Sequence, residues 1–275
     1  MKRLLSLLCL LVLMLTLFGC ADQPHEGMLV EVIDVGQSDC TLITVDDAAL
    51  MIDTATVTQR AAGQAALRRQ NISRIEYLLL THLHEDHVGN ARMLLETYTV
   101  GALLLPPIEN SELDLRLLTE AAERRGVPIH ILQNGDMFAL SGATVEVLQA
   151  GGDSEDPNDA SAVVTVTFGK TRFLFTGDRE EAGEARLLAS VPPEKLQSDV
   201  LKAGHHGSQN ATGKALLTAV APCHVAFSCG ESNGYGFPHT AVLKRLAEIG
   251  VEWHRTDKEG SLCYFSDGEC VRYIE

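Results

Sequence analysis

Short apolar runs rich in β-branched residues alternate with helical patterns along the chain, and the turns between them carry Gly, Asp and Asn. This alternation is typical of an α/β domain, in which strands and helices pack in layers. Because neither a repeat of fixed period nor a low-complexity linker interrupts it, we expect one domain over residues 27–275. The predicted strands occupy residues 28–35, 40–45, 48–53, 75–82, 127–132, 143–150, 161–169 and 171–178. The predicted helices occupy residues 58–69, 111–126, 179–190, 209–220 and 239–249.

Residues 1–19 differ from the rest of the chain. Two basic residues precede a leucine-rich run over residues 4–18, as in a secretory signal peptide. A transmembrane anchor is the alternative, but the run is short for a bilayer span, and Asp, Gln and Pro follow at residues 22–24. We therefore expect residues 1–19 to be a cleaved signal and residues 20–26 to be a short tether.

The signal ends in Leu17-Phe18-Gly19-Cys20, which resembles a bacterial lipobox. In a lipobox the signal is cut before the cysteine, and the cysteine takes a lipid. The resemblance implies a bacterial lipoprotein that is attached to the membrane through a lipid on Cys20. Its expected location is the outer face of the cytoplasmic membrane.

The chain without its signal is strongly acidic. Its formal charge is −17, since 20 basic residues then face 37 acidic ones. Affinity for nucleic acid comes largely from Lys and Arg side chains that meet phosphates, and the chain contains no basic run. We therefore expect no broad surface for extended nucleic acid.

Five cysteines remain besides Cys20, in a compartment that permits disulfides. Cys263 and Cys270 flank a predicted hairpin. Cys223 and Cys229 bracket a predicted strand. Each pair is therefore either bridged or simply buried, and the odd count leaves at least one thiol free.

The segment LLLTHLHEDH, residues 78–87, places three histidines and two carboxylates directly after a buried strand. In an extended segment side chains alternate between faces, so His82 and His84 point the same way. Leu83 then points back into the core. Two imidazoles are therefore expected to meet at the end of the strand.

A helix that begins near Val88 would place Asp86 and His87 at its entry, where they reach the same space from the other side. Imidazole nitrogens and a carboxylate suit zinc or another first-row divalent ion. Four such groups close together can serve two ions and leave open positions for water, so we expect a metal site here. A polar loop with incidental histidines is the alternative, and the density of the pattern argues against it.

Two further strand ends carry residues that can bind metal. Asp178 follows the apolar run FLFTG, and His205 and His206 follow DVLKAG. Taken alone, Asp178 also fits the N-cap of the helix predicted after it, and the histidine pair is ambiguous. Three strand ends that all finish in such residues favour one shared metal centre.

The segment THLHEDHVGN is similar to the His-x-His-x-Asp-His signature of the metallo-β-lactamase superfamily. Four further segments resemble, in order, the soluble hydrolase domain of ComEC-type competence proteins, and the likeness covers nearly all of the chain after residue 27. These segments are VIDVGQSDCTLITVDDAALMIDTA, NDASAVVTVTFGKTRFLFTGD, LKAGHHGSQNA and GYGFPHTAVLKRL. The resemblance implies an α/β fold, a metallo-β-lactamase-like αββα four-layer sandwich of two mixed β-sheets flanked by helices. It also implies a dinuclear metal site along one edge of the sheets.

The family pattern, carried over residue by residue, implies two ions that share one carboxylate. The implied ligands are His82 and His84 for one ion, Asp86 and His87 for the other, and Asp178 as the bridge. One of His205 and His206 would complete the ligands of the second ion. Its neighbour would contact substrate or support the site.

The chain departs from the family pattern at two positions. Many members have a third histidine for the first ion where this chain has Asn158, so that ion is held more weakly or is absent. Phe237 stands where the family often has a histidine, and His239 either faces the cleft or is a surface residue at a helix start. The residues expected to contact substrate or support the site are Asp34, Gln37, Asn158, Ser208 and His239.

Some of these positions also have a purely structural explanation. A floor of hydrogen-bonding residues beneath the site accounts for Asp34, Gln37 and Asp39 as well as catalysis does. Asp53 is expected to be a structural carboxylate in the turn after a strand.

The expected mechanism uses metal chemistry rather than a nucleophilic side chain. Two divalent ions lower the pKa of a shared water towards neutrality, so that hydroxide forms at physiological pH, and they polarise the bond under attack. Asp86 is expected to orient this water, and His206 to take part in catalysis with it. Zinc is the first expectation and manganese or iron the alternatives, because mixed imidazole and carboxylate sites accept all three.

Two ions close together favour phosphodiesters, because they can clamp both the attacking and the leaving oxygens, whereas a lactam, lactone or thioester needs mainly carbonyl polarisation. The ComEC-type resemblance also implies phosphodiester cleavage, with DNA as substrate, but the acidic charge favours a small or surface-attached envelope phosphodiester. We therefore expect a metal-dependent phosphodiesterase that acts outside the cytoplasmic membrane. A hydrolase of carbonyl substrates and a non-catalytic metal-binding or interaction protein on the same fold are the alternatives.

Overall fold

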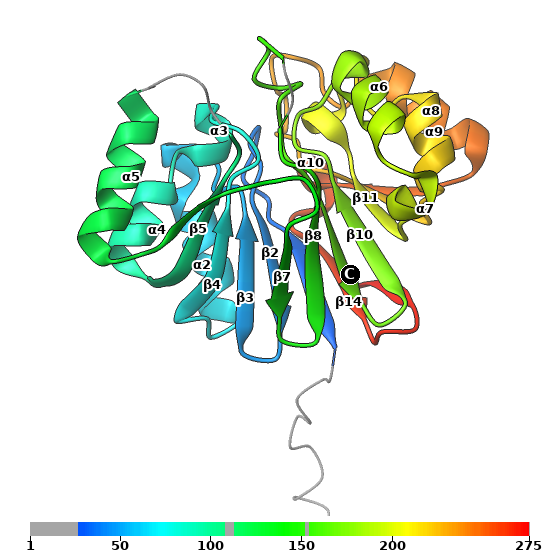
Figure 1. Cartoon of the computed structure of the whole chain (residues 1–275). Helices are drawn as coiled ribbons and strands as arrows, with labels where there is room; N and C mark the ends of the chain where they lie inside the picture. The colour runs from blue at the N-terminus through cyan, green and yellow to red at the C-terminus, as the bar shows by residue number, and fades with distance from the viewer. Residues whose placement is uncertain (1–26, 108–112, 152–153, 275) are drawn as a thin grey trace, which may run out of the picture.

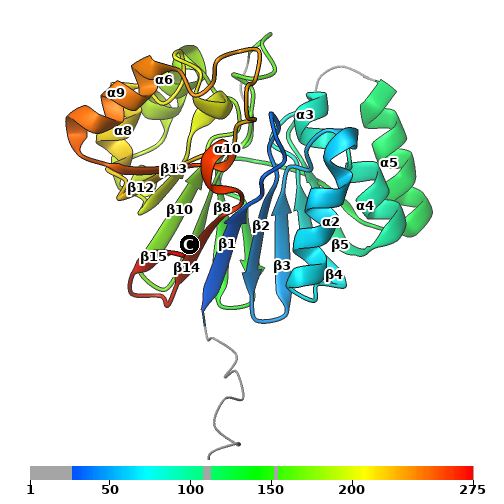
Figure 2. The same cartoon turned by 180° about the vertical axis from the view of Figure 1, so that it is seen from behind.

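The computed structural model shows two β-sheets packed face to face, with helices on both outer faces (Figures 1 and 2). It describes residues 27–107, 113–151 and 154–274. The expected signal, the tether and Cys20 lie outside these described ranges. None of the helices within the ranges has the length and apolar character that a membrane crossing requires.

One sheet has eight strands in the order β15-β14-β1-β2-β3-β4-β5-β6. Its strands are β1 (Met28–Val32), β2 (Thr41–Val45), β3 (Ala48–Ile52), β4 (Arg74–Leu79), β5 (Thr99–Leu105), β6 (Ile129–Ile131), β14 (Leu262–Ser266) and β15 (Val271–Ile274). Neighbouring strands are antiparallel from β15 to β3 and parallel from β3 to β6. This sheet is therefore mixed.

The other sheet has seven strands in the order β13-β12-β11-β10-β9-β8-β7. Its strands are β7 (Met137–Leu140), β8 (Ala143–Gln149), β9 (Val163–Phe168), β10 (Thr171–Phe175), β11 (Val200–Lys202), β12 (His224–Phe227) and β13 (Glu252–Arg255). Neighbours are antiparallel from β7 to β10 and parallel from β10 to β13. Parallel neighbours need crossover connections, which the helices supply.

Helices cover the outer face of each sheet. Those on the eight-stranded sheet are α2 (Arg60–Arg69), α4 (Ala91–Thr97) and α5 (Leu113–Arg125). Those on the seven-stranded sheet are α6 (Glu181–Ser190), α7 (Pro193–Leu196), α8 (Lys214–Val220) and α9 (Thr240–Ile249). Four single turns lie in loops, namely η1 (Val57–Gln59), α3 (Glu85–Val88), η2 (Gly204–Gly207) and α10 (Thr256–Glu259).

Three buried apolar layers hold the sheets and helices together. On β3, Leu50 and Ile52 face the layer between the sheets, while Ala49 and Met51 face the layer beneath the helices. Because side chains alternate along a strand, a strand covered on both faces carries an unbroken apolar run. The predicted αββα four-layer sandwich is confirmed.

Several elements were not predicted, among them α4, β5 and β7, and β5 contains Gly101. In the structure a Cβ at Gly101 would lie only 2.4 Å from the carbonyl oxygen of Glu76 on β4. The close approach of β4 and β5 therefore requires glycine in the middle of a strand.

The predicted hairpin between Cys263 and Cys270 is present as the antiparallel pair β14–β15. The thiols of Cys40, Cys223, Cys229, Cys263 and Cys270 are all free. Neither of the two candidate pairs is therefore bridged in the described part of the chain.

Strands β3 and β4 are parallel to each other, as are β10 and β11. Their carboxyl ends lie at the end of the sandwich that carries α3, which is uppermost in Figure 1. The segments that follow these four ends contain Asp53, the histidine-rich segment 82–87, Asp178 and the pair His205–His206. The topology thus brings four distant segments to one edge.

Candidate metal centre

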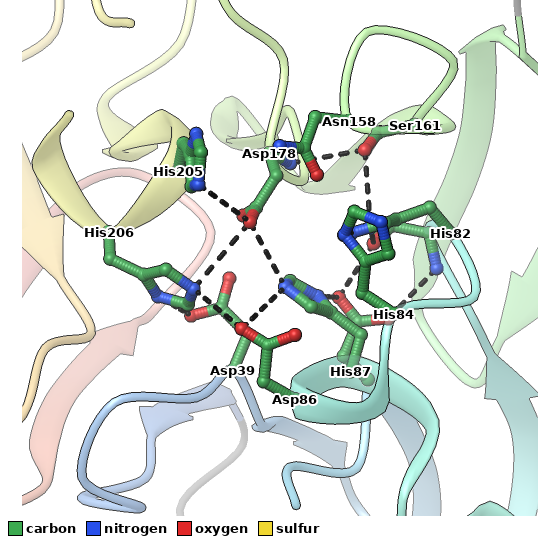
Figure 3. A network of polar contacts seen from close by, with 12 residues as sticks. Asp39, His82, His84, Asp86, His87, Asn158, Ser161, Asp178, His205 and His206 are labelled. Atoms are coloured by element: carbon green, nitrogen blue, oxygen red, sulfur yellow. Dashed lines mark hydrogen bonds and ion pairs between the residues drawn. The ribbon is translucent and has the colours of Figure 1, made fainter. Parts of the chain in front are cut away.

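The segment after β4 turns two imidazoles towards each other at the end of the sheet. Nε2 of His82 lies 3.1 Å from Nδ1 of His84 (Figure 3). Leu83 between them packs against the apolar layer beneath the helices. This is the alternation that the sequence predicted.

Asp86 and His87 lie within the single turn α3. The turn begins at Glu85, three residues before the expected start at Val88. It begins there because the carbonyl oxygen of His84 accepts the N–H groups of His87 and Val88, at 2.9 and 3.0 Å. Both potential ligands are therefore fixed by helical backbone rather than by a loop.

Asp178 and the histidine pair come from the seven-stranded sheet. Asp178 does not cap α6, because the N-cap residue of that helix is Glu180. His205 and His206 have φ values of 44° and 52°, in the left-handed region that residues other than glycine rarely adopt. Surrounding contacts hold this strained turn. Nδ1 of His205 donates to the carboxylate of Glu180 at 2.8 Å, and Nδ1 of His206 donates to the carbonyl oxygen of Ser228 at 3.0 Å.

Four of the predicted residues meet around one carboxylate oxygen. Oδ2 of Asp178 lies 3.3 Å from Nε2 of His87 and 3.6 Å from Nε2 of His206 (Figure 3). Oδ2 of Asp86 lies 3.3 Å from the same nitrogen of His206. One possible ligand atom from each of the four residues lies within 4.8 Å of the others. A third of the Asp86 side chain is exposed, at 33%, whereas the other three are buried, so the group opens to solvent beside Asp86.

In this group the carboxylates favour the protonated forms of His87 and His206, and these histidines favour the ionised form of Asp178. Burial alone would lower the pKa of His206, but the carboxylates of Asp178 and Asp39 raise it to about 10. Burial would also lower the pKa of His87, yet Asp178 and Asp53 raise it well above its ordinary value. Burial would raise the pKa of Asp178, but His87 and His206 hold it well below its ordinary range. A divalent cation can take the place of these protons.

Asp53 lies directly behind His87. Its Oδ2 accepts a hydrogen bond of 2.8 Å from Nδ1 of His87. Thr81 donates its backbone N–H to Oδ1 and its hydroxyl to Oδ2 of Asp53, each at 2.8 Å. The sequence predicted only a structural turn carboxylate, and the structure adds a direct contact with a predicted metal ligand.

A buried ion pair lies behind His206. Nζ of Lys202 is 2.7 Å from Oδ2 of Asp39, and Oδ1 of Asp39 is 3.4 Å from Nδ1 of His206. Sequence reasoning placed Asp39 in the floor of the site but overlooked Lys202. A lysine at the end of the apolar run of β11 is the signal that could have found it, because lysine is rarely buried unless it is paired.

His82 and His84 lie beside the four-residue group. The ring centroids of His82 and His87 are 4.1 Å apart. Nδ1 of His82 lies 3.3 Å from the hydroxyl of Ser161. The other ring nitrogen of His82, Nε2, therefore faces His84. Ser161 was not predicted, although its hydroxyl also accepts the backbone N–H of Asp178 at 3.1 Å. This serine therefore links the two sides of the site.

The backbone carbonyl oxygen of Asn158 accepts the N–H of Ser161 at 3.0 Å, and the Asn158 side chain is drawn with the site in Figure 3. Its Oδ1 is buried and has no hydrogen-bond partner among the described residues. The oxygen is therefore available to a cation or a substrate near the position where many family members have a third histidine.

The other predicted residues are engaged as follows. The hydroxyl of Ser208 donates to Oε1 of Glu180 at 2.8 Å, the oxygen that also accepts from His205. The ring of Phe237 stands 5.5 Å from the ring of His205 between centroids. These contacts make a wall beside the histidine pair.

His239 has the structural role that the sequence left open. It is the N-cap residue of α9, its Nδ1 accepts the N–H of Gln209 at 2.9 Å, and its Nε2 donates to the carbonyl oxygen of Tyr235 at 3.1 Å. Side-chain oxygens of Asp34 and Gln37 accept the N–H groups of Gly36 and Gly230, respectively. These residues thus shape the loops around the site.

Comparison with known proteins places this arrangement in a family. Residues 33–224 match the family described as the metallo-beta-lactamase superfamily. ComE operon protein 3 of Bacillus subtilis (strain 168) is 28% identical over 277 residues, which cover 93% of this chain and 35% of that protein. Recombination protein 2 of Haemophilus influenzae is 31% identical over 252 residues, which cover 87% of this chain and 28% of that protein. The chain thus spans about a third of the length of these relatives.

A solved structure shares the fold. The metallo-beta-lactamase fold protein YhfI from Bacillus subtilis superposes with a TM-score of 0.63 at 12% identity, covering 88% of this chain and 100% of that chain. The family match runs through the histidine-rich segment and Asp178 to the histidine pair. The chain belongs to the metallo-beta-lactamase superfamily.

Proposed function

We propose that this protein is a metal-dependent phosphodiesterase with a dinuclear centre, acting outside the cytoplasmic membrane. The single observation that carries the proposal is the position of Asp178, whose Oδ2 lies between Nε2 of His87 and Nε2 of His206. A carboxylate shared by imidazoles from both sheets is suited to bridge two ions. The His82–His84 pair lies close by and supplies donors for the second of them.

The residues present fit a divalent metal. Nε2 of His87 and Oδ1 of Asp178 are buried, and neither has a hydrogen-bond partner in the described parts of the chain. Buried polar atoms without partners are costly, and a cation would satisfy both. His87, Asp178, His206 and Asp86 would hold one ion, and His82 and His84 would hold the other with Asp178. Imidazole and carboxylate donors suit zinc first, with manganese or iron as alternatives.

Two ions held by these residues would lower the pKa of water and would neutralise charge on both the attacking and leaving oxygens, which phosphodiester cleavage requires. The protein's own groups have three tasks. Asp86, with its partly exposed carboxylate, orients the attacking water. Asp53 and the carbonyl of Ser228 fix the ring orientations of His87 and His206. His205, whose side chain is 25% exposed, stands at the wall of the site where a substrate oxygen can approach it.

The substrate class is proposed from charge and location. A lipid on Cys20 would hold the enzyme at the outer face of the membrane, and the acidic chain suits a small or surface-attached phosphodiester better than extended nucleic acid. DNA is the variant that relatives named as competence and recombination proteins suggest. Since the chain spans about a third of those proteins, this variant rests on a part of each.

The test uses the full chain, purified in detergent, with its metal content determined. Hydrolysis of bis(p-nitrophenyl) phosphate is compared with hydrolysis of a chromogenic β-lactam, for wild type, Asp178→Ala, His84→Ala and the control His130→Ala. His130 contacts Asp136 and lies on the edge strand β6, separated by β5 from β4, which leads into the site. About two ions per chain with diester cleavage that only the first two variants abolish would support the proposal.

Two other results would replace it. Cleavage of the β-lactam alone would assign a hydrolase of carbonyl substrates. Bound metal with no turnover of either substrate, or of short DNA, would leave a metal-binding protein on a hydrolase fold.

A further inference from the structure

A second group of metal-competent side chains lies away from the centre described above. His224 begins β12, and Glu252 and His254 lie on the neighbouring strand β13. Parallel pairing places His224 opposite Glu252 and Ala226 opposite His254. Because residues two apart on a strand share a face, all three side chains project from the same face of the sheet.

The three side chains converge closely enough to hold one ion. One possible ligand atom from each lies within 4.8 Å of the others. Nδ1 of His224 is 3.6 Å from Oε2 of Glu252, and Nε2 of His254 is 3.2 Å from Oε1 of Glu252. Two imidazole nitrogens on adjacent strands therefore face one carboxylate.

The two imidazole nitrogens that face Glu252 are buried without hydrogen-bond partners among the described residues. These are Nδ1 of His224 and Nε2 of His254. The His254 side chain is 90% buried, since 10% of it is exposed. The hydroxyl of Tyr264, whose ring centroid lies 5.8 and 6.1 Å from those of the two histidines, is also buried without a partner there. Buried polar atoms without partners are costly, and a cation between the two imidazoles would satisfy both nitrogens.

The surroundings hold His254 in the form that binds metal. Its Nδ1 donates to Oε2 of Glu259 at 2.9 Å, so the lone pair for a metal is on Nε2. The hydroxyl of Tyr273 donates to the same oxygen at 3.0 Å, and the Tyr273 ring stacks on His254 with 3.6 Å between centroids. A carboxylate behind a histidine ring is the usual support for a metal-binding histidine.

We propose that His224 Nδ1, His254 Nε2 and the carboxylate of Glu252 form a separate zinc site. Two imidazoles and one carboxylate, with water in the fourth position, are an established ligand set for zinc. The site lies at the opposite end of β12 from Ser228, whose carbonyl oxygen supports His206. Four residues of strand place it about 13 Å from that carbonyl. The ion would join β12 to the edge strand β13.

The experiment measures zinc stoichiometry rather than hydrolysis. Full chain in detergent is stripped with chelator and titrated with Zn²⁺, and then with Co²⁺ for its visible absorption spectrum. The variants are His224→Asn and Glu252→Gln, with His130→Asn as the matched control. His130 also has a carboxylate neighbour, Asp136, at 2.6 Å, but among the described residues it belongs to no group of three side chains that could hold a metal ion.

Wild type and His130→Asn are expected to bind one zinc ion more per chain than either variant of the new site. Glu252→Gln keeps the test valid if His224→Asn fails to fold, because the Glu252 side chain is 59% exposed and its replacement is tolerated. Equal zinc stoichiometry, and equal zinc-dependent increases in Tm, in all four proteins would overturn the proposal. The result does not depend on hydrolysis, so a protein without phosphodiesterase activity would still show the difference.

Discussion

The carboxylate of Asp53 accepts a hydrogen bond of 2.8 Å from Nδ1 of His87, and the exposed fractions of the two side chains are 2% and 0%. This contact directs Nε2 of His87 towards Asp178, on the opposite sheet. Thr81 fixes Asp53 in turn through two hydrogen bonds. The orientation of one predicted ligand is therefore set by a residue that comes 34 positions earlier in the chain.

Replacement of this carboxylate tests whether it positions the ligand. Asp53→Asn keeps the shape and the left-handed backbone at φ 57°, which asparagine tolerates, but its amide cannot accept all three hydrogen bonds. We expect metal affinity to fall about 10- to 100-fold. Competition with a chromogenic chelator measures it. Asp46→Asn, the same change at an exposed aspartate that also has a left-handed φ of 50°, is the control, and equal affinities in the two variants would contradict the role of Asp53.

The two histidines of the HHG segment are expected to differ. His206 belongs to the four-residue group, whereas His205 donates to Glu180 and its Nε2 stands 3.8 Å from Oδ2 of Asp178. His206→Ala should therefore remove about one metal ion per chain, because the ion held by His87, Asp178, His206 and Asp86 loses one of its four donors. His205→Ala should keep the metal and lower turnover of the diester. Elemental analysis after dialysis, together with the rate on bis(p-nitrophenyl) phosphate, separates the two; loss of metal in His205→Ala alone would reverse the assignment.

The pair Lys202–Asp39 is expected to matter for stability as well as for the site. Both side chains are buried, at 4% and 7% exposed. Lys202→Met leaves the Asp39 carboxylate without its cation, and breaking a buried pair in this way costs about 3–5 kcal/mol in the free energy of unfolding. The double variant Asp39→Asn/Lys202→Met should lose less than the sum of the single variants. Urea unfolding followed by the fluorescence of Trp253 gives the three values, and strict additivity would show that the pair is not coupled.

Glu184 should make stability depend on pH. Burial raises the pKa of this carboxyl to about 7, although the N–H groups of Gly213 and Thr212 donate to it. In the unfolded chain the pKa is about 4.3, so the folded state binds the proton more tightly. This stabilisation is complete below about pH 4.3 and is lost as the pH rises to about 7. Its full size is about 3–4 kcal/mol, at about 1.4 kcal/mol for each pKa unit.

The variant Glu184→Gln has no titrating group at this position. The difference in free energy of unfolding between variant and wild type should therefore move in the variant's favour between pH 4.5 and pH 7.5. Urea unfolding of both proteins at several pH values measures this difference. A constant difference across the range would show that the carboxyl titrates normally.

The sequence predicted the parts of the site that come directly after apolar strands. The histidines and Asp86 in segment 82–87, together with Asp178 and His206, stand out locally, because polar residues with metal chemistry end a buried run. Three such strand ends already favoured one shared centre, but the assignment of each residue to an ion came only from the family resemblance. The α/β class was predicted from the alternation of strands and helices, and the four-layer sandwich from the family resemblance.

The supporting residues could not be found in this way. Lys202 and Asp39 are 163 positions apart, and Ser161 and His82 are 79 apart, so no local pattern connects them. In the sequence Asp53 cannot be told from an ordinary turn carboxylate, because its contact with His87 is visible only in the folded structure. Strand β5 was missed. Its Gly101 is explained by the close approach of strand β4, which the residues of its own segment do not reveal.

The four-residue group takes Asp86 and His87 from the segment after β4 of the eight-stranded sheet, and Asp178 and His206 from the segments after β10 and β11 of the seven-stranded sheet. Each half of the sandwich therefore carries an incomplete set of ligands. The eight-stranded sheet is complete only when β14 and β15, at residues 262–274, pair beside β1, so a chain still on the ribosome cannot finish even this sheet. In the proposed enzyme the ligands come together only when both sheets are in place, so hydrolysis would report the completion of folding.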